Sequence, residues 1–145
     1  MAEDNRHQSI SECIRDLLIE GTNDEYMSGD IIIEDFNLDQ EPGFGIIISP
    51  AGERELLGTN ERDDIEYMTV ITRIAHSLGN EDIRGKSIFR VNVRKLLHNK
   101  RLACVDGCTA FSRVEFGEYA IPRKWISENK SVSSMRVFTL VRESR

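Results

Sequence analysis

The clearest pattern along the chain is a helical repeat of apolar residues near its start. Apolar side chains recur at intervals of three and four residues, at Ile10, Cys13, Ile14, Leu17 and Leu18. Ser9 and Glu12 have the spacing of a capping box, and Gly21 supplies a C-terminal stop. The pattern predicts an amphipathic helix from Ser9 to Gly21 that packs one face on a sheet. The preceding residues, 1–8, are predicted to form a flexible N-terminus.

Three runs in the middle of the chain predict strands. Asp30 to Phe36 and Phe44 to Ser49 are rich in β-branched and aromatic residues, which favour extended backbone. Ile65 to Ile74 carries apolar residues at both alternating sets of positions, so we expect a strand that is buried on most of both faces and central in the sheet. The intervening residues 50–64 hold proline, glycine and many charges, and they are predicted to form a long exposed loop.

A second helix and three more strands are predicted in the rest of the sequence. Ser87 to Asn99 places its apolar residues on one helical face. Leu102 to Cys108 and Ala110 to Ile121 flank Asp106-Gly107, a dipeptide that favours a tight turn, so we expect a hairpin there. Ser134 to Val141 alternates and is predicted to be the last strand, with one side partly exposed. The apolar face of the helix consists of Phe89, Val93, Leu96 and Leu97.

These elements predict an α+β fold with the order α-β-β-β-α-β-β-β, in which two helices pack on a mixed or antiparallel sheet. The chain has 145 residues, enough for one domain spanning 1–145 with a core of its own. The longest uncharged apolar run, Ile31–Ile33, is far shorter than a bilayer span. The acidic start lacks the order of a secretory signal. We therefore expect no membrane contact and a protein that stays in the cytoplasm where it is made.

The chain has three cysteines, an odd number, and two of them are close together. This predicts reduced thiols instead of a disulfide framework, with Cys13 as a small core residue. Cys104 and Cys108 together with His76 or His98 match a zinc site only weakly, because no second close pair of Cys or His exists. We therefore expect no bound metal, and we expect joint replacement of Cys104 and Cys108 by serine to cost little stability.

Charge is distributed unequally along the chain. Residues 1–85 hold 20 acidic and 6 basic residues, a net charge of about −14, whereas residues 86–145 hold 5 acidic and 13 basic residues, about +8. Surfaces of opposite sign on one subunit favour head-to-tail association, in which each copy docks on the next and a ring can close. The alternative is that the fold interleaves the two halves, so that the charges mix over the surface.

The sequence contains no motif that predicts catalysis or a cofactor. The segment 41–45 has glycines but lacks the lysine and following helix of a phosphate-binding loop. No pair of titratable residues has a spacing that predicts an active site, so we expect a protein that is not an enzyme, with no catalytic, cofactor-binding or metal-binding residue. One basic cluster surrounds the second helix: Lys86, Arg90, Arg94, Lys95, Lys100 and Arg101. A monomeric binding module that uses this Lys86–Arg101 surface on DNA or on an acidic protein is therefore an alternative.

The chain resembles the small neck proteins of tailed bacteriophages, most of all the tail terminator, or tail completion, group. The likeness lies in the size, the order of elements, the early helix and the segments 46–52 and 63–67, and it extends from Ser9 to Arg145. The resemblance implies an α+β fold, a hexameric ring that caps the tail tube, and a surface for the DNA-filled head. The partners would be the tail tube protein and a head–tail connector or adaptor protein. The protein would then be part of the virion, at the neck, after assembly in the host cytoplasm.

The resemblance also suggests roles for two groups of charged residues. Acidic residues would line a lumen or its rim, through which DNA passes without sticking: Glu61, Asp63 and Asp64. Basic residues would contact the neighbouring subunit or the tail tube: Arg90, Arg94 and Lys95. The chain lacks an evident extended arm, and Cys104 and Cys108 have no counterpart in the family pattern. A head-completion or adaptor ring is therefore the nearest variant.

Overall fold

The structure, a computed structural model, describes residues 2–21, 31–33, 45–56, 64–76, 80–105, 108–115 and 130–143. Within these residues the chain forms two helices, α1 (Ala2–Gly21) and α2 (Asn80–Leu97). The strands are β1 (Ile31–Ile33), β2 (Gly45–Leu56), β3 (Asp64–His76), β4 (Lys100–Arg101), β5 (Cys108–Glu115) and β6 (Lys130–Glu143). The order is α-β-β-β-α-β-β-β, as predicted.

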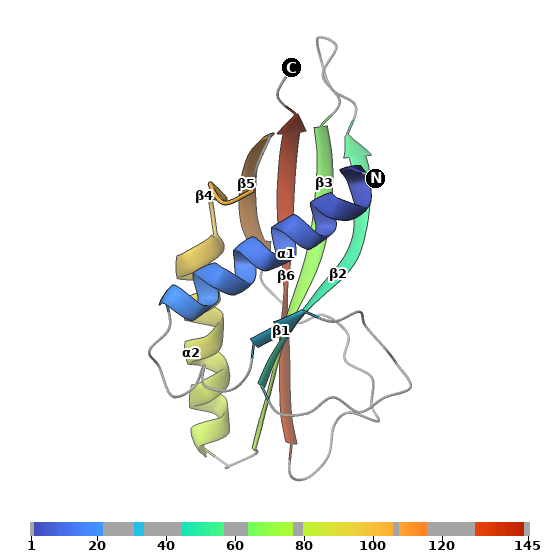
Figure 1. Cartoon of the computed structure of the whole chain (residues 1–145). Coiled ribbons are helices and arrows are strands. Elements are labelled where there is room, and N and C mark those ends of the chain that lie inside the picture. The colour runs from blue at the N-terminus through green and yellow to red at the C-terminus, as the bar shows by residue number, and fades with distance from the viewer. Residues whose placement is uncertain are drawn as a thin grey trace.

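The six strands form one sheet in the order β1-β2-β3-β6-β5-β4 (Figure 1). β1 is parallel to β2, whereas every other neighbouring pair in this order is antiparallel. β3 therefore lies at the centre, with β2 on one side and β6 on the other. The structure confirms the prediction of an α+β fold with a mixed sheet and two packed helices.

Both helices contribute to one core on the same face of the sheet. α1 crosses the sheet diagonally, and α2 packs against β5 and β6 (Figure 1). The helices contribute the buried residues Ile10, Ile14, Leu18, Phe89, Val93 and Leu97. The strands contribute, among others, Tyr67, Ile71, Met135 and Val137. Each of these side chains is at most 1% exposed, so the helical repeats in the sequence do mark the buried faces.

α1 begins at Ala2, well before the predicted start at Ser9, so residues 2–8 belong to the helix. Gln8 Nε2 donates a hydrogen bond to Glu12 Oε1 at 2.9 Å, one turn further along. Glu12, the predicted capping partner of Ser9, therefore supports the middle of a longer helix.

β2 continues through Pro50–Leu56, which had been predicted to be the start of an exposed loop. The register against β3 shifts between Pro50 and Gly52, and Gly52 has a φ of +136°. Glycine adopts positive φ at little cost, so these two residues mark a β-bulge within the strand instead of its end. The loop prediction is wrong for this segment and for Asp64, which starts β3, whereas 57–63 lie outside the described residues.

The other elements differ from the prediction mainly in length. α2 begins at Asn80, earlier than predicted, and Asn99 just beyond it has a φ of 55°, the left-handed conformation common after a helix. The predicted first strand of the hairpin, Leu102 to Cys108, is wrong, because 102–105 are not in a strand and Cys108 starts β5. The strand that pairs with β5 is instead the two-residue β4, which precedes this segment. Three predicted segments, 34–36, the turn Asp106-Gly107 and 116–121, lie outside the described residues.

Cys13 and Cys104 form a disulfide with a Cα–Cα distance of 5.6 Å, although 91 residues separate them in sequence. Cys13 is 2% exposed in the core, as predicted. The prediction of reduced thiols is wrong for this pair, because the fold brings α1 against the turn that follows β4. The expectation that replacing Cys104 together with Cys108 costs little stability is therefore also wrong, since the replacement breaks a covalent link.

Candidate functional site

The sheet face opposite the helices is divided into a buried and an open half. In the buried half Ile47, Ile74 and Val132 form a small apolar cluster. In the open half, charged side chains from four strands surround two apolar ones. We call this half the open face, and it consists of Arg54, Glu66, Met68, Arg113, Glu115, Arg136 and Phe138.

Strand register explains why these residues meet. Alternate residues of a strand share one face, so each of the four strands presents every second side chain on the open face. Directly opposed residues of neighbouring strands then become contacts across the sheet. The register sets three pairs opposite each other: Arg54 and Glu66, Arg113 and Phe138, Glu115 and Arg136.

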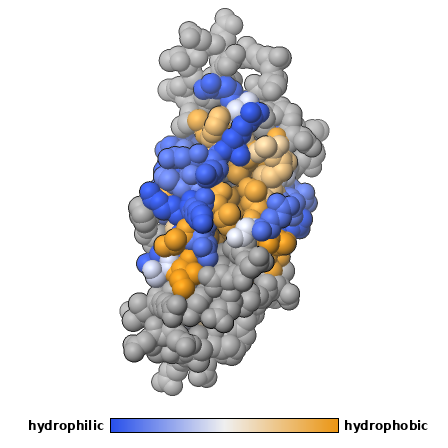
Figure 2. Space-filling model, turned by 90° about the vertical axis from the view of Figure 1, so that its left-hand side faces the viewer, coloured by the Kyte–Doolittle hydropathy of each residue, from blue (hydrophilic) through white to orange (hydrophobic). Residues whose placement is uncertain are grey.

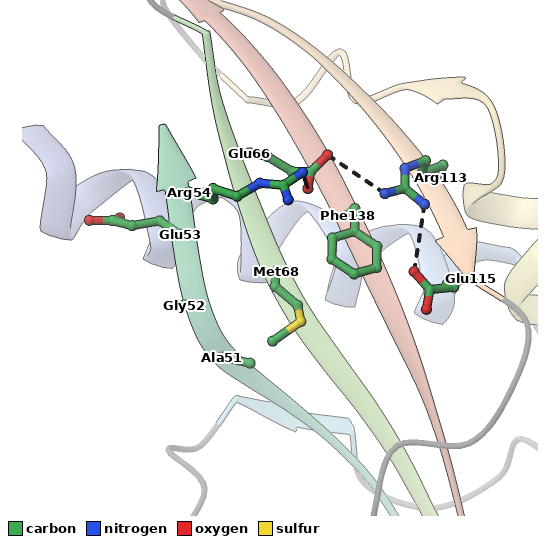
Figure 3. Close-up of a pocket in the computed structure, with 9 residues that line it drawn as sticks. All are labelled: Ala51, Gly52, Glu53, Arg54, Glu66, Met68, Arg113, Glu115 and Phe138. Carbon is green, nitrogen blue, oxygen red and sulfur yellow. Dashed lines mark hydrogen bonds and ion pairs between the residues drawn. The ribbon is translucent and has the colours of Figure 1, made fainter. Parts of the chain in front are cut away.

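The charged residues form a continuous chain of ion pairs across the sheet, and Figure 3 draws all of them except Arg136. The N–O distances are 3.1 Å for Arg54–Glu66, 3.7 Å for Arg113–Glu66, 3.7 Å for Arg113–Glu115 and 2.6 Å for Arg136–Glu115. The Glu66 side chain is 12% exposed, whereas the side chains of its partners Arg54 and Arg113 are 69% and 48% exposed. Glu66 is therefore the least exposed residue of the chain and the centre of its Arg54–Glu66–Arg113 part. In the whole chain three guanidinium groups face two carboxylates.

A hollow of about 350 Å³ lies within the open face. Met68 and Phe138 lie between the charged groups that border it (Figure 3). The Arg113 guanidinium carbon is 4.4 Å from the centroid of the Phe138 ring, a cation–π contact that holds the arginine over the ring. Gly52 lines the hollow from β2, and no atom lies within 4 Å of the position that a Cβ would take there. The hollow is therefore open along β2.

This arrangement is suited to contact with another macromolecule. An apolar centre with a charged border is the usual anatomy of a protein–protein contact. The lining residues that the structure describes contain no histidine, cysteine, serine or threonine. Their carboxylates are already paired, those of Glu66 and Glu115 with arginines and that of Glu53 with His7. The described side chains thus offer recognition groups and no activated nucleophile.

Replacement of Glu66 by glutamine is expected to lower the free energy of unfolding by about 1–2 kcal/mol, because the amide keeps the shape of the side chain but loses two charge-assisted contacts. Arg54→Ala is the matched control and should cost about 0.5 kcal/mol or less, since Arg54 is 69% exposed. Urea unfolding of both variants tests this. Equal costs would show that Glu66 is not the centre of the Arg54–Glu66–Arg113 part of the chain.

The predicted contact residues Arg90, Arg94 and Lys95 lie together on α2, away from the open face. Arg90 and Arg94 are half-buried beside the packed face of the helix, and Lys95 is exposed. Val91, on the same helix, is 60% exposed. Figure 2 views the side that carries α2 and β4 in Figure 1 and shows apolar residues next to charged ones there. The structure therefore groups these cations beside an exposed apolar residue.

The predicted lumen residues fall at the edge of what the structure describes. Glu61 and Asp63 lie outside the described residues. Asp64 is the first residue of β3, opposite Leu56 of β2 and Arg142 of β6 in the register. Its backbone therefore lies at the end of the sheet where β2 ends and β3 begins.

Two of the weak zinc candidates, Cys104 and His98, have other partners in the structure. Cys104 is bonded to Cys13, and His98 Nδ1 accepts a hydrogen bond from the Val114 backbone N–H at 3.0 Å. The part of the chain that the structure describes contains no group of three His, Cys, Asp or Glu side chains placed to hold a metal ion. His98 instead satisfies a backbone donor at the side of β5.

Sequence reasoning missed the open face. Its charges come from strands far apart in sequence, and β2 had been assigned to a loop beyond Ser49, which removed Arg54 from consideration. The only local signal is a pair of charged or aromatic residues two apart in each of the last two strands, Arg113 with Glu115 and Arg136 with Phe138. That spacing predicts that the two residues share a face of the sheet, but it does not predict which residues of the neighbouring strands they contact.

The fold keeps the two differently charged halves of the chain apart within the sheet. β1, β2 and β3 come from the acidic residues 1–85, and β6, β5 and β4 come from the basic residues 86–145. The strands of the two halves meet only at the β3–β6 pair. α1 is the exception, because it extends from the acidic side of the sheet to contact α2 (Figure 1). The two outer strands of the sheet thus belong to halves of opposite charge.

Comparison with other proteins gives no assignment. No protein-family model matches the chain, and no curated protein matches its sequence. Neither α1 nor α2 is long and apolar enough to cross a membrane, in the part of the chain that was searched.

Proposed function

We propose that this protein is a structural virion protein of a tailed bacteriophage that forms a ring at the neck. In this proposal the ring, of six copies, caps the tail tube and joins it to the head as a tail terminator. The observation that carries it is that strands from the acidic half of the sequence and strands from its basic half occupy opposite sides of the sheet. Size, fold class and order of elements agree with the family that the sequence resembles.

Sides that come from oppositely charged halves of the sequence favour a heterologous contact. When the side from the basic half of one copy meets the side from the acidic half of the next, the same contact repeats, and a suitable rotation between copies closes a ring. A two-fold dimer would instead place each side against its own equivalent, where like charges repel. The charge separation therefore supports a ring over a dimer.

In this ring the α2 cations have a defined place. α2 leads directly to β4, so Arg90, Arg94 and Lys95 lie on the basic side of the molecule (Figure 1). There they contact the acidic side of the neighbouring subunit or the tail tube. Glu61, Asp63 and Asp64 remain the proposed lumen or rim residues, and of these the structure describes only Asp64, at the end of the sheet where β3 begins. Negative charge there lets DNA pass without adhering.

Two alternatives to the tail terminator function are each supported by a specific observation. A head-completion or adaptor ring would use the same charge separation at a different position in the neck. A monomeric binding module is favoured by the exposed residues Lys95, Lys100 and Arg101, which have no ion-pair partner among the described residues. Salt-sensitive DNA binding by a monomer would distinguish it. A small enzyme is the least supported class, because the carboxylates of the hollow are already paired.

The double replacement Arg90→Glu and Arg94→Glu is expected to weaken self-association at least about tenfold while the fold persists, because two cations become anions at the contact with an acidic neighbour. Light scattering coupled to size exclusion, at low and high salt, measures the native mass, and negative-stain microscopy shows whether a ring forms. The matched control is Arg90→Gln with Arg94→Gln, which should have a smaller effect. Unchanged mass with unchanged circular dichroism in the reversed variant would remove α2 from the interface.

A further inference from the structure

The sheet has an incompletely paired strand on its acidic side. β1 pairs with β2 only at Ile46–Ile48. From Ser49 to Leu56, β2 is paired with β3 on one side, and no described strand lies on its other side. Gly52, Glu53 and Arg54 in this stretch are exposed. A strand with one side free presents backbone hydrogen-bonding groups to which another strand can add.

β4 forms the opposite edge of the sheet. It pairs with β5 through Lys100 and Arg101, both of which are exposed. The side of β5 next to it is occupied, because the Leu102 N–H donates to Ala110 O at 2.8 Å and the Val114 N–H donates to His98 Nδ1 at 3.0 Å. On this side of the sheet the outermost described backbone is therefore β4.

We infer that β4 of one copy adds to the free stretch of β2 in the next copy, so that a continuous sheet runs through neighbouring subunits. The partner is a second copy of this chain. The inference rests on the proposed ring and identifies the strands that form its subunit contact. Strand addition at an exposed edge is a common mode of protein recognition, with affinity from main-chain hydrogen bonds and specificity from side chains.

The strand directions permit this contact. Four successive antiparallel steps separate β2 from β4 in the sheet, so the two strands run in the same direction. Side-by-side copies in the same orientation therefore place β4 parallel to β2, the same relation that β1 has to β2. Figure 1 shows β4 and the distal part of β2 at similar heights on opposite sides of the sheet.

The side chains are complementary on the helix-covered face. Glu53 lies opposite Tyr67, a core residue on that face, and Lys100 lies opposite the buried Ser112. Because directly opposed residues share a face, Glu53 and Lys100 point to the same side of the sheet. When the two strands pair, Lys100 of one copy meets Glu53 of the next, beside His7, whose Nε2 is 3.1 Å from Glu53 Oε2.

The same charges act against wrong pairings. Two β4 strands would place Lys100 and Arg101 against their own equivalents, and two β2 strands would do the same with Glu53 and Arg54. Like charges directly opposite each other are destabilising, so each edge selects the other. Pro50 and the bulge restrict addition to the part of β2 beyond Gly52. On the open face, Arg101 approaches Arg54, whose charge is matched by Glu66.

Cross-linking between introduced cysteines tests the contact. We choose Glu53→Cys with Lys100→Cys in one chain, on a Cys108→Ser background that keeps the native disulfide. Within one copy four strand spacings, about 19 Å, separate β2 from β4, too far for a disulfide, which needs Cα atoms within about 7 Å. Any 53–100 link is therefore between copies. Mild oxidation should give a ladder of linked species that ends at the ring size, with the link identified by mass spectrometry.

The matched control is Glu53→Cys with Arg101→Cys, which places the two thiols on opposite faces and should cross-link about tenfold less. Light scattering of the same samples tests the proposed ring separately from the strand contact. A ring without the 53–100 link, or with equal linking through position 101, would overturn the strand contact and leave the ring intact. A monomer at millimolar concentration, with no ladder, would overturn both the proposed ring and this contact.

Discussion

Loss of the Cys13–Cys104 disulfide is expected to lower the free energy of unfolding by roughly 2–5 kcal/mol, one of the two largest effects predicted for this chain. The bond joins residues 91 apart and so closes a long loop that restricts the unfolded chain. In the chain-entropy account a loop of this length contributes close to the upper end of that range. The expected result is therefore a much less stable protein when Cys104 is replaced by serine.

Urea unfolding of wild type, Cys104→Ser and Cys108→Ser measures this effect. Cys108 takes no part in the bond, so Cys108→Ser is the control and should change the unfolding free energy much less. Dithiothreitol should lower the stability of wild type to that of Cys104→Ser and leave the latter unchanged. Thiol titration of the unreduced protein should find one free thiol of the three cysteines. Three free thiols in the oxidised protein would contradict the pairing.

The disulfide also bears on where the proposed assembly takes place. Cytoplasmic thiols are kept reduced by the glutathione and thioredoxin systems. The stability that matters during assembly in a host cytoplasm is therefore the value measured with dithiothreitol, and the oxidised value applies to the finished particle outside the cell. Comparison of native mass with and without reductant then shows whether self-association depends on the bond.

The order of elements could be predicted because local apolar spacing reports which face of each element is buried. Ile10, Ile14 and Leu18 repeat at four-residue intervals and are all fully buried, as are Phe89 and Val93. The continuous apolar character of the third strand correctly predicted a central place in the sheet and burial on both faces over 69–74, whereas Glu66 and Met68 on the open face are half-buried. These signals are contained within single elements and need no knowledge of their neighbours.

The predictions that are wrong rest on residue types that have a different structural role in this fold from their commonest one. Ser9 and Glu12 have capping-box spacing, but Glu12 pairs with Gln8 within a longer helix. Pro50 and Gly52 are typical turn residues, yet here they form a bulge inside β2. In each case the residue types were interpreted by their commonest use, and packing against the sheet or helix selected another.

The open face and the disulfide were beyond sequence reasoning for a further reason. Glu66 on β3 contacts Arg113 on β5 because only one strand, β6 from the end of the chain, lies between β3 and β5 in the sheet. Cys13 meets Cys104 only because α1 crosses the sheet toward the region that follows α2. Such contacts depend on strand order and register, which composition and periodicity do not determine. The difference in charge between the two halves of the sequence was visible in the sequence. That the strands of the two halves also lie apart in the sheet depends on the same strand order.

The second large effect is expected from Phe89→Ala, which should cost about 3–5 kcal/mol of unfolding free energy. Phe89 is 0% exposed in the core between α2 and the sheet, so truncation leaves a cavity and removes buried aromatic surface. Val91→Ala is the matched control on the same helix. Val91 is 60% exposed, so its truncation should change stability by about 0.5 kcal/mol or less. Thermal and urea unfolding of both variants make the comparison, and similar costs would show that α2 packs in another orientation.

The same pair of variants separates the fold from the proposed contact. Val91 stands on the side of α2 that carries Arg90 and Lys95, so in the proposed ring its apolar surface is covered by the neighbouring subunit or by the tail tube. Val91→Ala should therefore weaken association several-fold without a change in unfolding free energy, because a small apolar contact at a charged interface is lost. Two results together would assign the subunit contact to the strands and leave α2 for the tail tube. These are an unchanged native mass of Val91→Ala at every concentration and a lower native mass of the Glu53 and Lys100 variants.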